Sequence, residues 1–256
     1  MATPAPAHRS TRRTDQYPDP ERPDAGLAFF STWRVPAPAD LRPTLDAIAR
    51  AWESRDWPHD GLLSYSVYAG EDGVTLMHHS QWRDERAYQD FFEAAGNGRD
   101  ARNEEIDRAV PGIRRLGLLK TRRYRSGSEP GDERVPGAVV VVQAVFDGPD
   151  PDRQRAWVDA VFDALAGDTA DGSIADRPGG ISAHFHLSLD GTTVVNYAEW
   201  ESAQAHIAAL ATPGEGIGTP DERWRRVQQY PGLRGDAGGV NRYVLAYQLL
   251  PDGGVE

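Results

Sequence analysis

The feature that most constrains the fold of this chain is an internal duplication. Two turns, Asp72-Gly73 and Asp190-Gly191, each precede an alternating β-rich run that ends in a tryptophan, Trp82 or Trp200. Thr75/Thr193 and Ala87/Ala205 fall at the same spacing, and two later motifs also recur: Pro111-Gly-Ile-Arg114/Pro231-Gly-Leu-Arg234 and Arg123-Tyr124/Arg242-Tyr243. A pattern repeated in this way indicates one supersecondary unit that is encoded twice.

Each half predicts the same order of elements: strand, helix, two strands, helix, short helix and strand. In the first half we expect strands at 27–35, 62–69, 74–82 and 116–124, with helices at 40–52, 84–95 and around Ile106. In the second half we expect strands at 138–146, 181–189, 192–200 and 240–249, with helices at 151–166, 202–210 and around Trp224. The order predicts an α+β fold of two ferredoxin-like (βαββαβ) repeats. Because the uncovered face of each sheet needs a partner, we expect them to pack sheet-to-sheet as an intramolecular α+β barrel.

Composition shifts suggest four segments. Residues 1–25 are rich in Pro, Arg and Asp and are expected to be a disordered leader. Residues 26–126 are the first ferredoxin-like repeat, and the Gly-, Ser- and acid-rich residues 127–136 are the linker. Residues 137–250 are the second repeat. A fused pair predicts a monomer (pseudo-dimer), and a homodimer of such monomers stays open.

Charge and cysteine content exclude several function classes. The net charge of −11 argues against nucleic acid and anionic membranes as partners. Without cysteine the chain has no thiolate nucleophile and no Cys-held metal site. We see neither an apolar run long enough to cross a membrane nor a signal peptide, so we expect a cytoplasmic protein.

The strand before Trp200 carries the most informative side chains. Alternation places Asn196, Ala198 and Trp200 on one face and Tyr197 on the other. In the first half His78 stands where Asn196 stands, and Trp82 matches Trp200. An amide and an indole on one sheet face suit a planar polar ligand, although an Asn or Trp on a strand is most often structural.

The segment Asn196-Tyr-Ala-Glu-Trp200, followed by Glu201-Ser-Ala-Gln-Ala-His206, resembles the sheet-to-helix signature of the antibiotic biosynthesis monooxygenase family, within the dimeric α+β barrel superfamily. The counterpart in the first half is His78-His-Ser-Gln-Trp82 followed by Arg83-Asp-Glu-Arg-Ala-Tyr88. The resemblance implies a cofactor-independent monooxygenase of secondary-metabolite biosynthesis, with no flavin, haem or metal. Its expected partners are O2 and a small electron-rich aromatic substrate, such as a phenol or an anthrone-type polyketide intermediate.

The resemblance also implies site residues. Asn196 and Trp200 are carried over as catalytic candidates, and an arginine further along is expected among Arg223, Arg225 and Arg226. The first half departs from the pattern at His78, so we expect one competent site, with His78 and Trp82 as secondary catalytic candidates. The candidate substrate contacts are Tyr197, Arg223, Arg226, His184 and His186.

The chemistry of the amide side chain fits Asn196 as a hydrogen-bond donor to a developing oxyanion, but it leaves alternative functions open. His184-x-His186 could supply two metal ligands, but no third ligand is evident, so no metal site is predicted. A polyketide cyclase or isomerase on the same scaffold, or a non-catalytic barrel that binds an aromatic ligand, would use the same residues. A haem-degrading role is disfavoured, because Phe92 and Leu210 stand ten residues after each tryptophan, where we would look for a ligating histidine.

Overall fold

The computed structural model describes residues 9–94, 96, 98–128, 131–168, 178–211, 222–235 and 237–253. The chain divides into two compact units. Unit 1 comprises Met1–Leu118 and Leu245–Glu256, and unit 2 comprises Leu119–Val244. The division therefore falls inside two long strands, β5 (Arg114–Ser128) and β9 (Gly239–Pro251).

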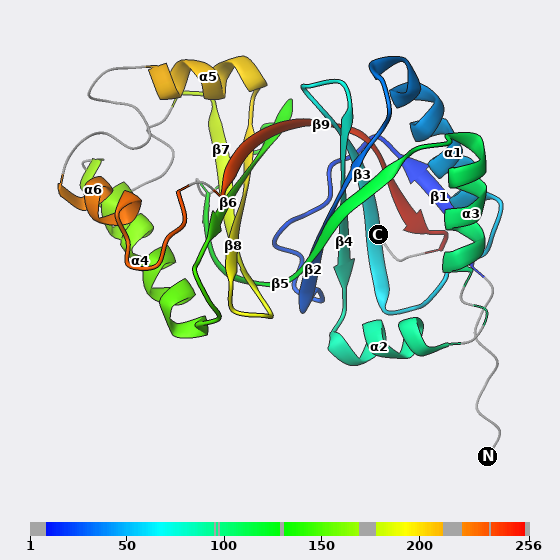
Figure 1. The fold of residues 1–256 in the computed structure, drawn as a ribbon, viewed down its shortest axis with the longest axis horizontal. Helices are drawn as coiled ribbons and strands as arrows, with labels where there is room; N and C mark the ends of the chain where they lie inside the picture. The colour runs from blue at the N-terminus through cyan, green and yellow to red at the C-terminus, as the bar shows by residue number, and fades with distance from the viewer. Residues whose placement is uncertain are drawn as a thin grey trace. The chain divides into compact units, whose positions relative to one another are not determined.

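Unit 1 has the predicted βαββαβ order. Its elements, besides the start of β5 and the end of β9, are β1 (Thr11–Thr14), β2 (Leu27–Arg34), η1 (Pro38–Asp40), α1 (Leu41–Glu53), β3 (Leu62–Gly70), β4 (Thr75–Trp82), α2 (Glu85–Glu93) and α3 (Arg99–Ala109). The strand order is β1-β9-β3-β4-β2-β5, and β4 pairs antiparallel with both β2 and β3. Helices α1 and α3 lie against one face of this sheet (Figure 1).

Unit 2 repeats this arrangement. Its elements, besides the end of β5 and the start of β9, are β6 (Ala138–Val145), α4 (Pro151–Asp168), β7 (Gly180–Ser188), β8 (Thr193–Trp200), α5 (Ala203–Ala211) and α6 (Glu222–Gln228). The strand order is β5-β7-β8-β6-β9, with antiparallel pairing throughout. The predicted α+β class with two ferredoxin-like units is confirmed, whereas the sheet-to-sheet packing of the units stays a prediction.

The two Asp-Gly turns fold as the sequence predicted. Gly73 and Gly191 have φ angles of +70° and +75°, which a glycine adopts without a steric penalty. The preceding aspartates close the turns, because Asp72 Oδ1 accepts from Thr75 N at 2.8 Å and Asp190 Oδ1 accepts from Thr192 N at 3.0 Å. The same local chemistry thus sets the hairpin register in both units.

A close contact between a helix and the turn residue just before a strand is also duplicated. A Cβ atom added to Gly61 would lie 2.3 Å from Ala87 Cβ, and one added to Gly179 would lie 2.4 Å from Ala205 Cβ. Small residues are therefore required on both sides of each contact. This packing explains why Ala87 and Ala205 recur at the same spacing in the two halves.

The expected disordered leader, residues 1–25, contains a strand in its described part, and residues 1–8 lie outside the described residues. Residues 11–14 form β1, which pairs with residues 248–251 of β9. Further contacts hold the segment, since Gln81 Nε2 donates to Asp19 O at 2.7 Å and Trp57 N donates to Arg9 O. Pairing with a distant strand offsets the low apolar content on which the prediction of disorder was based.

The expected linker at 127–136 starts inside a strand. Gly127 and Ser128 belong to β5 and pair with Ala183 and Ser182 of β7. Backbone pairing along an edge makes few demands on side chains, so a Gly- and Ser-rich composition does not reveal it.

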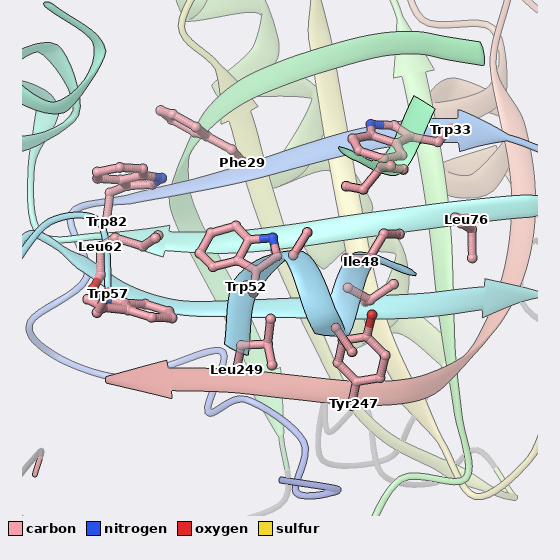
Figure 2. Close-up of a cluster of buried hydrophobic side chains, with 14 of the residues drawn as sticks. Phe29, Trp33, Ile48, Trp52, Trp57, Leu62, Leu76, Trp82, Tyr247 and Leu249 are labelled. Atoms are coloured by element: carbon pink, nitrogen blue, oxygen red, sulfur yellow. Dashed lines mark hydrogen bonds between the residues drawn. The ribbon is translucent and has the colours of Figure 1, made fainter. Parts of the chain in front are cut away.

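Each unit has its own hydrophobic core. In unit 1 the core gathers several tryptophans, with Trp52 of α1 packed over the sheet near Trp57 (Figure 2). Tyr247 and Leu249 from β9 complete it, and Tyr247 Oη donates to Leu45 O at 2.8 Å. In unit 2 the core lies between the sheet and α4 and α6, and it leaves a cavity.

Candidate active site

The unit 2 cavity has a volume of about 210 Å³ and lies between the sheet and helices α4 and α6. Its walls are mostly apolar side chains, including Val142, Trp157, Val161, Phe185, Trp224 and Val227. Asn196, Ala198 and Trp200 of β8 face it together, as strand alternation predicted. The structure therefore brings the two leading candidates, Asn196 and Trp200, to one cavity.

Asn196 is the polar group that distinguishes this cavity. The residue sits in a central strand, paired with Val142 of β6 and Phe185 of β7. Among the described residues that line the cavity, it alone has a buried side-chain atom, Oδ1, without a hydrogen-bond partner. The hydroxyl of Ser182, a second polar lining residue, is committed to Glu199 Oε2 at 2.7 Å. A buried polar atom without a partner is uncommon and suggests a place for a ligand.

Trp200 forms one wall of the cavity, and its indole is almost completely buried. Its backbone carbonyl accepts from Gly137 N at 2.9 Å, which fixes the end of β8 against the start of β6. The His206 ring meets the indole edge to face, with centroids 4.9 Å apart and planes at 82°. The flat indole is thus held rigidly where a planar ligand could stack on it.

His206 is a residue near the site whose role the sequence did not reveal. Arg242 Nε donates to His206 Nδ1 at 3.1 Å. Burial, helped by the positive charge of Arg242, lowers the pKa of His206 to about 4. The ring is therefore neutral at pH 7 and orients Trp200 without adding charge. Its signal in the sequence was a single histidine in a helix made mostly of alanine, leucine and isoleucine.

Three candidate substrate contacts lie on the other face of the sheet. Tyr197, His184 and His186 are buried there and do not line the unit 2 cavity. His184 instead joins a hydrogen-bonded chain, with Nδ1 2.9 Å from Ser126 Oγ and Nε2 2.9 Å from Ser182 Oγ. Within the part of the chain that the structure describes, no cluster of three or more metal-ligating side chains occurs.

The arginine cluster also lies away from this cavity. Arg223, Arg225 and Arg226 are exposed on α6, whereas Trp224 and Val227 of the same helix line the cavity. Helical periodicity explains the separation, because residues 224 and 227 share a face that the three arginines leave. The structure therefore gives none of them a contact in the cavity.

Unit 1 has a cavity at the equivalent place, with a volume of about 410 Å³. Trp82 lines it, as its match to Trp200 predicted, together with Trp33, Trp52, Tyr65 and Phe91. Unlike the unit 2 cavity, its lining includes cationic groups, and its polar and cationic residues are Ser31, Ser80, Arg99, Arg102, Asn103 and Arg115.

His78 contacts two lining residues of the unit 1 cavity without lining it. Its Nδ1 is hydrogen-bonded to Tyr65 Oη at 2.7 Å, and its ring lies 4.2 Å from the Trp33 ring. Burial, with a smaller effect of Arg115, lowers the pKa of His78 to about 3. A group with so low a pKa is a weak proton acceptor at pH 7, so the geometry does not favour His78 as a general base. The neighbouring His79 lies on the opposite face, against Phe30.

Arg102 and Arg115 are functional candidates that the sequence did not single out. Arg102 of α3 is 5% exposed, with its guanidinium 4.6 Å from the centroid of the Trp52 ring. Arg115 of β5 lies 4.5 Å from the centroid of the Trp33 ring. A signal was present, because Arg102 precedes the buried Ile106 by four residues and so shares its helix face.

Two further observations bear on the alternatives. A haem-ligating histidine would be expected at the positions of Phe92 and Leu210. These two side chains are 51% and 47% exposed and line neither cavity. Of the helices in the described residues, none has the length and apolarity to span a bilayer.

A match to a protein family falls in unit 2, the unit whose cavity holds Asn196 and Trp200. Residues 139–214 match the family model described as antibiotic biosynthesis monooxygenase. A stretch of 40 residues is 52% identical to the tetracenomycin-F1 monooxygenase of Streptomyces glaucescens, and it covers 16% of this chain and 36% of that protein. This chain therefore matches about a third of the length of that relative.

A solved structure at 18% identity shows the same fold. The crystal structure of an anthrone oxidase-like protein superposes with a TM-score of 0.64 and 18% identity, covering 91% of this chain and 95% of that chain. A monooxygenase-like protein from Listeria innocua gives a TM-score of 0.45 and 9% identity over 86% and 94% of the two chains. The segment of this chain that holds Asn196 and Trp200 lies within the match to the antibiotic biosynthesis monooxygenase family model.

Proposed function

We propose that this chain is a cofactor-independent monooxygenase that oxidises an electron-rich aromatic compound in the unit 2 cavity. The substrate class is a phenol or an anthrone-type intermediate of secondary metabolism. The observation that carries the proposal is the Asn196 amide, which faces an apolar cavity with a buried oxygen that no described residue satisfies. The family match over residues 139–214 and the names of the related proteins support the reaction class.

The reaction needs only the substrate and O2. Ground-state O2 is a triplet and reacts slowly with closed-shell molecules, but an electron-rich carbanion or phenolate can give it one electron directly. For an anthrone, the ring CH2 becomes a C=O: four electrons leave the carbon, one oxygen atom enters the product, and the other leaves as water. The protein's task is to bind the substrate, favour its anion and exclude bulk water.

Asn196 stabilises the anion of the substrate. Its NH2 group can donate to an oxyanion without losing a proton, and rotation of the amide exchanges donor and acceptor ends. The surrounding wall is apolar, so the hydrogen bond is not weakened by competing water. One such donor contributes roughly 3–4 kcal/mol to lowering the barrier, or about 10²–10³ in rate.

Trp200 positions the ring system. The indole is fixed by the backbone pairing of β8 and by the edge-to-face contact with His206, so it presents a rigid flat wall. A cavity of about 210 Å³ is smaller than most drug-sized sites, which span roughly 300–1,000 Å³, and favours a compact planar substrate. His206 and His78 are both too weakly basic to remove a proton efficiently, so the acidity of the substrate itself determines the pH dependence.

The test is oxygen uptake by metal-stripped protein with an anthrone and no added cofactor. We expect uptake to match quinone formation and to fall by about 10²–10³ in Asn196→Leu, which keeps the approximate side-chain size but removes the amide. Asn241→Leu, at an exposed position of β9, is the matched control and should retain the wild-type rate. Unchanged uptake in Asn196→Leu would contradict the assignment of the site.

An anaerobic arm separates the rival function. A cyclase or isomerase would use the same amide to hold an enolate, and it would turn over without O2. Conversion of a substrate at equal rates with and without oxygen would therefore replace the monooxygenase proposal by that alternative.

A further inference from the structure

The cavities of the two units occupy equivalent places but differ in chemistry. The strand registers align Ser31 with Val142, because each pairs with the residue in the His78/Asn196 position. Ser80 likewise aligns with Ala198, two residues before each tryptophan. Hydroxyl groups in unit 1 thus stand where unit 2 has a methyl-bearing side chain.

Both serine hydroxyls are oriented by indole donors. Trp33 Nε1 donates to Ser31 Oγ at 3.1 Å, and Trp82 Nε1 donates to Ser80 Oγ at 3.2 Å. Because the serine oxygens act as acceptors in these contacts, their own hydrogens remain as donors. Among the described residues, no acceptor is recorded for either hydroxyl hydrogen. The hydroxyls of Ser31 and Ser80 can therefore each donate a hydrogen bond to a ligand in the unit 1 cavity.

The lining of the unit 1 cavity is also cationic. Arg99, Arg102 and Arg115 line it, and no Asp or Glu is among its described lining residues. The carboxylates that pair with Arg99 and Arg115, Asp100 and Asp107, lie outside the lining. The net charge of the chain is −11, so the positive charge at this cavity does not follow from the overall composition and points to an anionic ligand.

Arg102 is the most constrained of these cations. It is 5% exposed, and its guanidinium lies over the face of Trp52, which in turn stacks on Tyr65 at 4.3 Å. Burial lowers the pKa of Arg102 to about 10, so the group stays charged at neutral pH. A guanidinium carries five N–H donors, so Arg102 can donate to a ligand in the cavity in addition to its contacts within the protein.

The remaining groups around the cavity are neutral at pH 7. Burial raises the pKa of Tyr65, and burial lowers the pKa of His78 to about 3. The charge of the cavity therefore comes from its arginines, and its walls from Trp33, Trp52, Trp82 and Phe91. A fitting ligand combines a flat apolar ring with one anionic group that accepts several hydrogen bonds.

We propose that the unit 1 cavity binds a planar aromatic carboxylate, with its ring between the tryptophans and its carboxylate facing Arg102 and the Ser31 and Ser80 hydroxyls. A guanidinium matches a carboxylate in planar geometry and can bind both of its oxygens. The chain thus has two ligand sites of different chemistry, one for a neutral or weakly acidic ring and one for a ring acid.

Calorimetric titration of the full chain with anthraquinone-2-carboxylate, beside the neutral anthraquinone-2-carboxamide, tests the proposal. We expect the carboxylate to bind at least about tenfold more tightly than the carboxamide. Arg102→Met should weaken carboxylate binding by at least about tenfold and change carboxamide binding by less than about twofold. Equal affinities of the two ligands in the wild type, or no carboxylate binding at millimolar concentration, would overturn the proposal.

A second variant covers the case in which Arg102→Met does not fold. Ser31→Val with Ser80→Ala installs the unit 2 residues at both positions and should weaken carboxylate binding about threefold to tenfold. Unchanged carboxylate affinity in this double variant, or in a folded Arg102→Met protein, would refute the assigned contacts.

Ala198→Leu, which fills the unit 2 cavity, separates this proposal from the proposed monooxygenase activity. It should abolish anthrone-dependent oxygen uptake and leave carboxylate binding intact. Loss of carboxylate binding in Ala198→Leu would place the acid in unit 2 and overturn the proposal. Absence of oxygen uptake in the wild type would count against the activity alone.

Discussion

Replacing Asn196 by leucine should make the protein more stable while it removes activity. The side chain projects from a central strand into an apolar cavity, and its buried Oδ1 has no hydrogen-bond partner among the described residues. An unsatisfied buried acceptor destabilises the folded state, because the group was hydrated in the unfolded chain. Leucine has a similar volume, no polar atom and favourable transfer from water.

The size of the effect follows from the two groups exchanged. Leaving a buried acceptor without a partner costs roughly 1–3 kcal/mol. Asn196 is partly exposed to the cavity, so only part of that penalty is recovered, and we take about 1–2 kcal/mol as the expected gain. At the size of these units, about 1 kcal/mol shifts Tm by roughly 2–8 °C.

The assay is thermal and urea unfolding of Asn196→Leu beside the wild type, without ligand, in parallel with oxygen uptake. Asn241→Leu is the control, since an exposed leucine gains no burial and should leave Tm within about 2 °C. A lower Tm for Asn196→Leu would mean that the amide is satisfied in the folded protein. It would refute the argument that the cavity keeps a polar group ready for a ligand.

Three other predictions concern the rest of the chain. Burial lowers the folded-state pKa of His79 to about 4, below its usual value near 6.5, so the unfolded chain takes up the proton first as the pH falls. The stability that the neutral ring contributes above pH 6.5 should therefore be lost as the pH falls towards 4. His79→Phe should reduce the difference between the free energies of unfolding measured in urea at pH 7.5 and at pH 5. Gly61→Ala, which places a methyl group 2.3 Å from the facing alanine methyl, should destabilise the protein by about 1–3 kcal/mol in urea unfolding, whereas Gly148→Ala, with nothing within 4 Å, should change it by less than about 0.5 kcal/mol. The double variant Arg223→Gln/Arg226→Gln should keep the wild-type rate of oxygen uptake, because both side chains are exposed on α6 outside the cavity. A large fall in the rate would mean that one of these arginines contributes to the site.

The sequence predicted those parts of the fold that local chemistry determines. Strand alternation placed Asn196 and Trp200 on one face, and the Asp-Gly turns marked both hairpins to within a residue or two. The same rule puts Tyr197 on the opposite face, which conflicts with the expectation that Tyr197 contacts the substrate. The structure follows the alternation.

What the sequence did not show depends on distant partners. β1 is a short polar strand whose only recognisable feature is its pairing with β9, more than two hundred residues further on. Arg102 and Arg115 become one wall of a cavity only when α3 and the start of β5 lie beside β2 and β4. Helical periodicity places Arg102 on the face of the buried Ile106, but neither periodicity nor composition shows that Arg102 and Arg115 line the same cavity.

The comparison of the two units separates residues that build the fold from residues that determine the ligand. The contacts between a turn glycine and a helix alanine are the same in both, and so are the turn aspartates and the tryptophan that ends the hairpin. The differences fall on positions that face or adjoin a cavity: Ser31/Val142, His78/Asn196 and Ser80/Ala198. Substitutions at these positions change the donors and acceptors that a ligand meets, but they leave intact the contacts that set the strand register. A duplicated unit can therefore acquire a second ligand chemistry without a new fold, which is why a sequence match that covers only unit 2 does not predict what the unit 1 cavity binds.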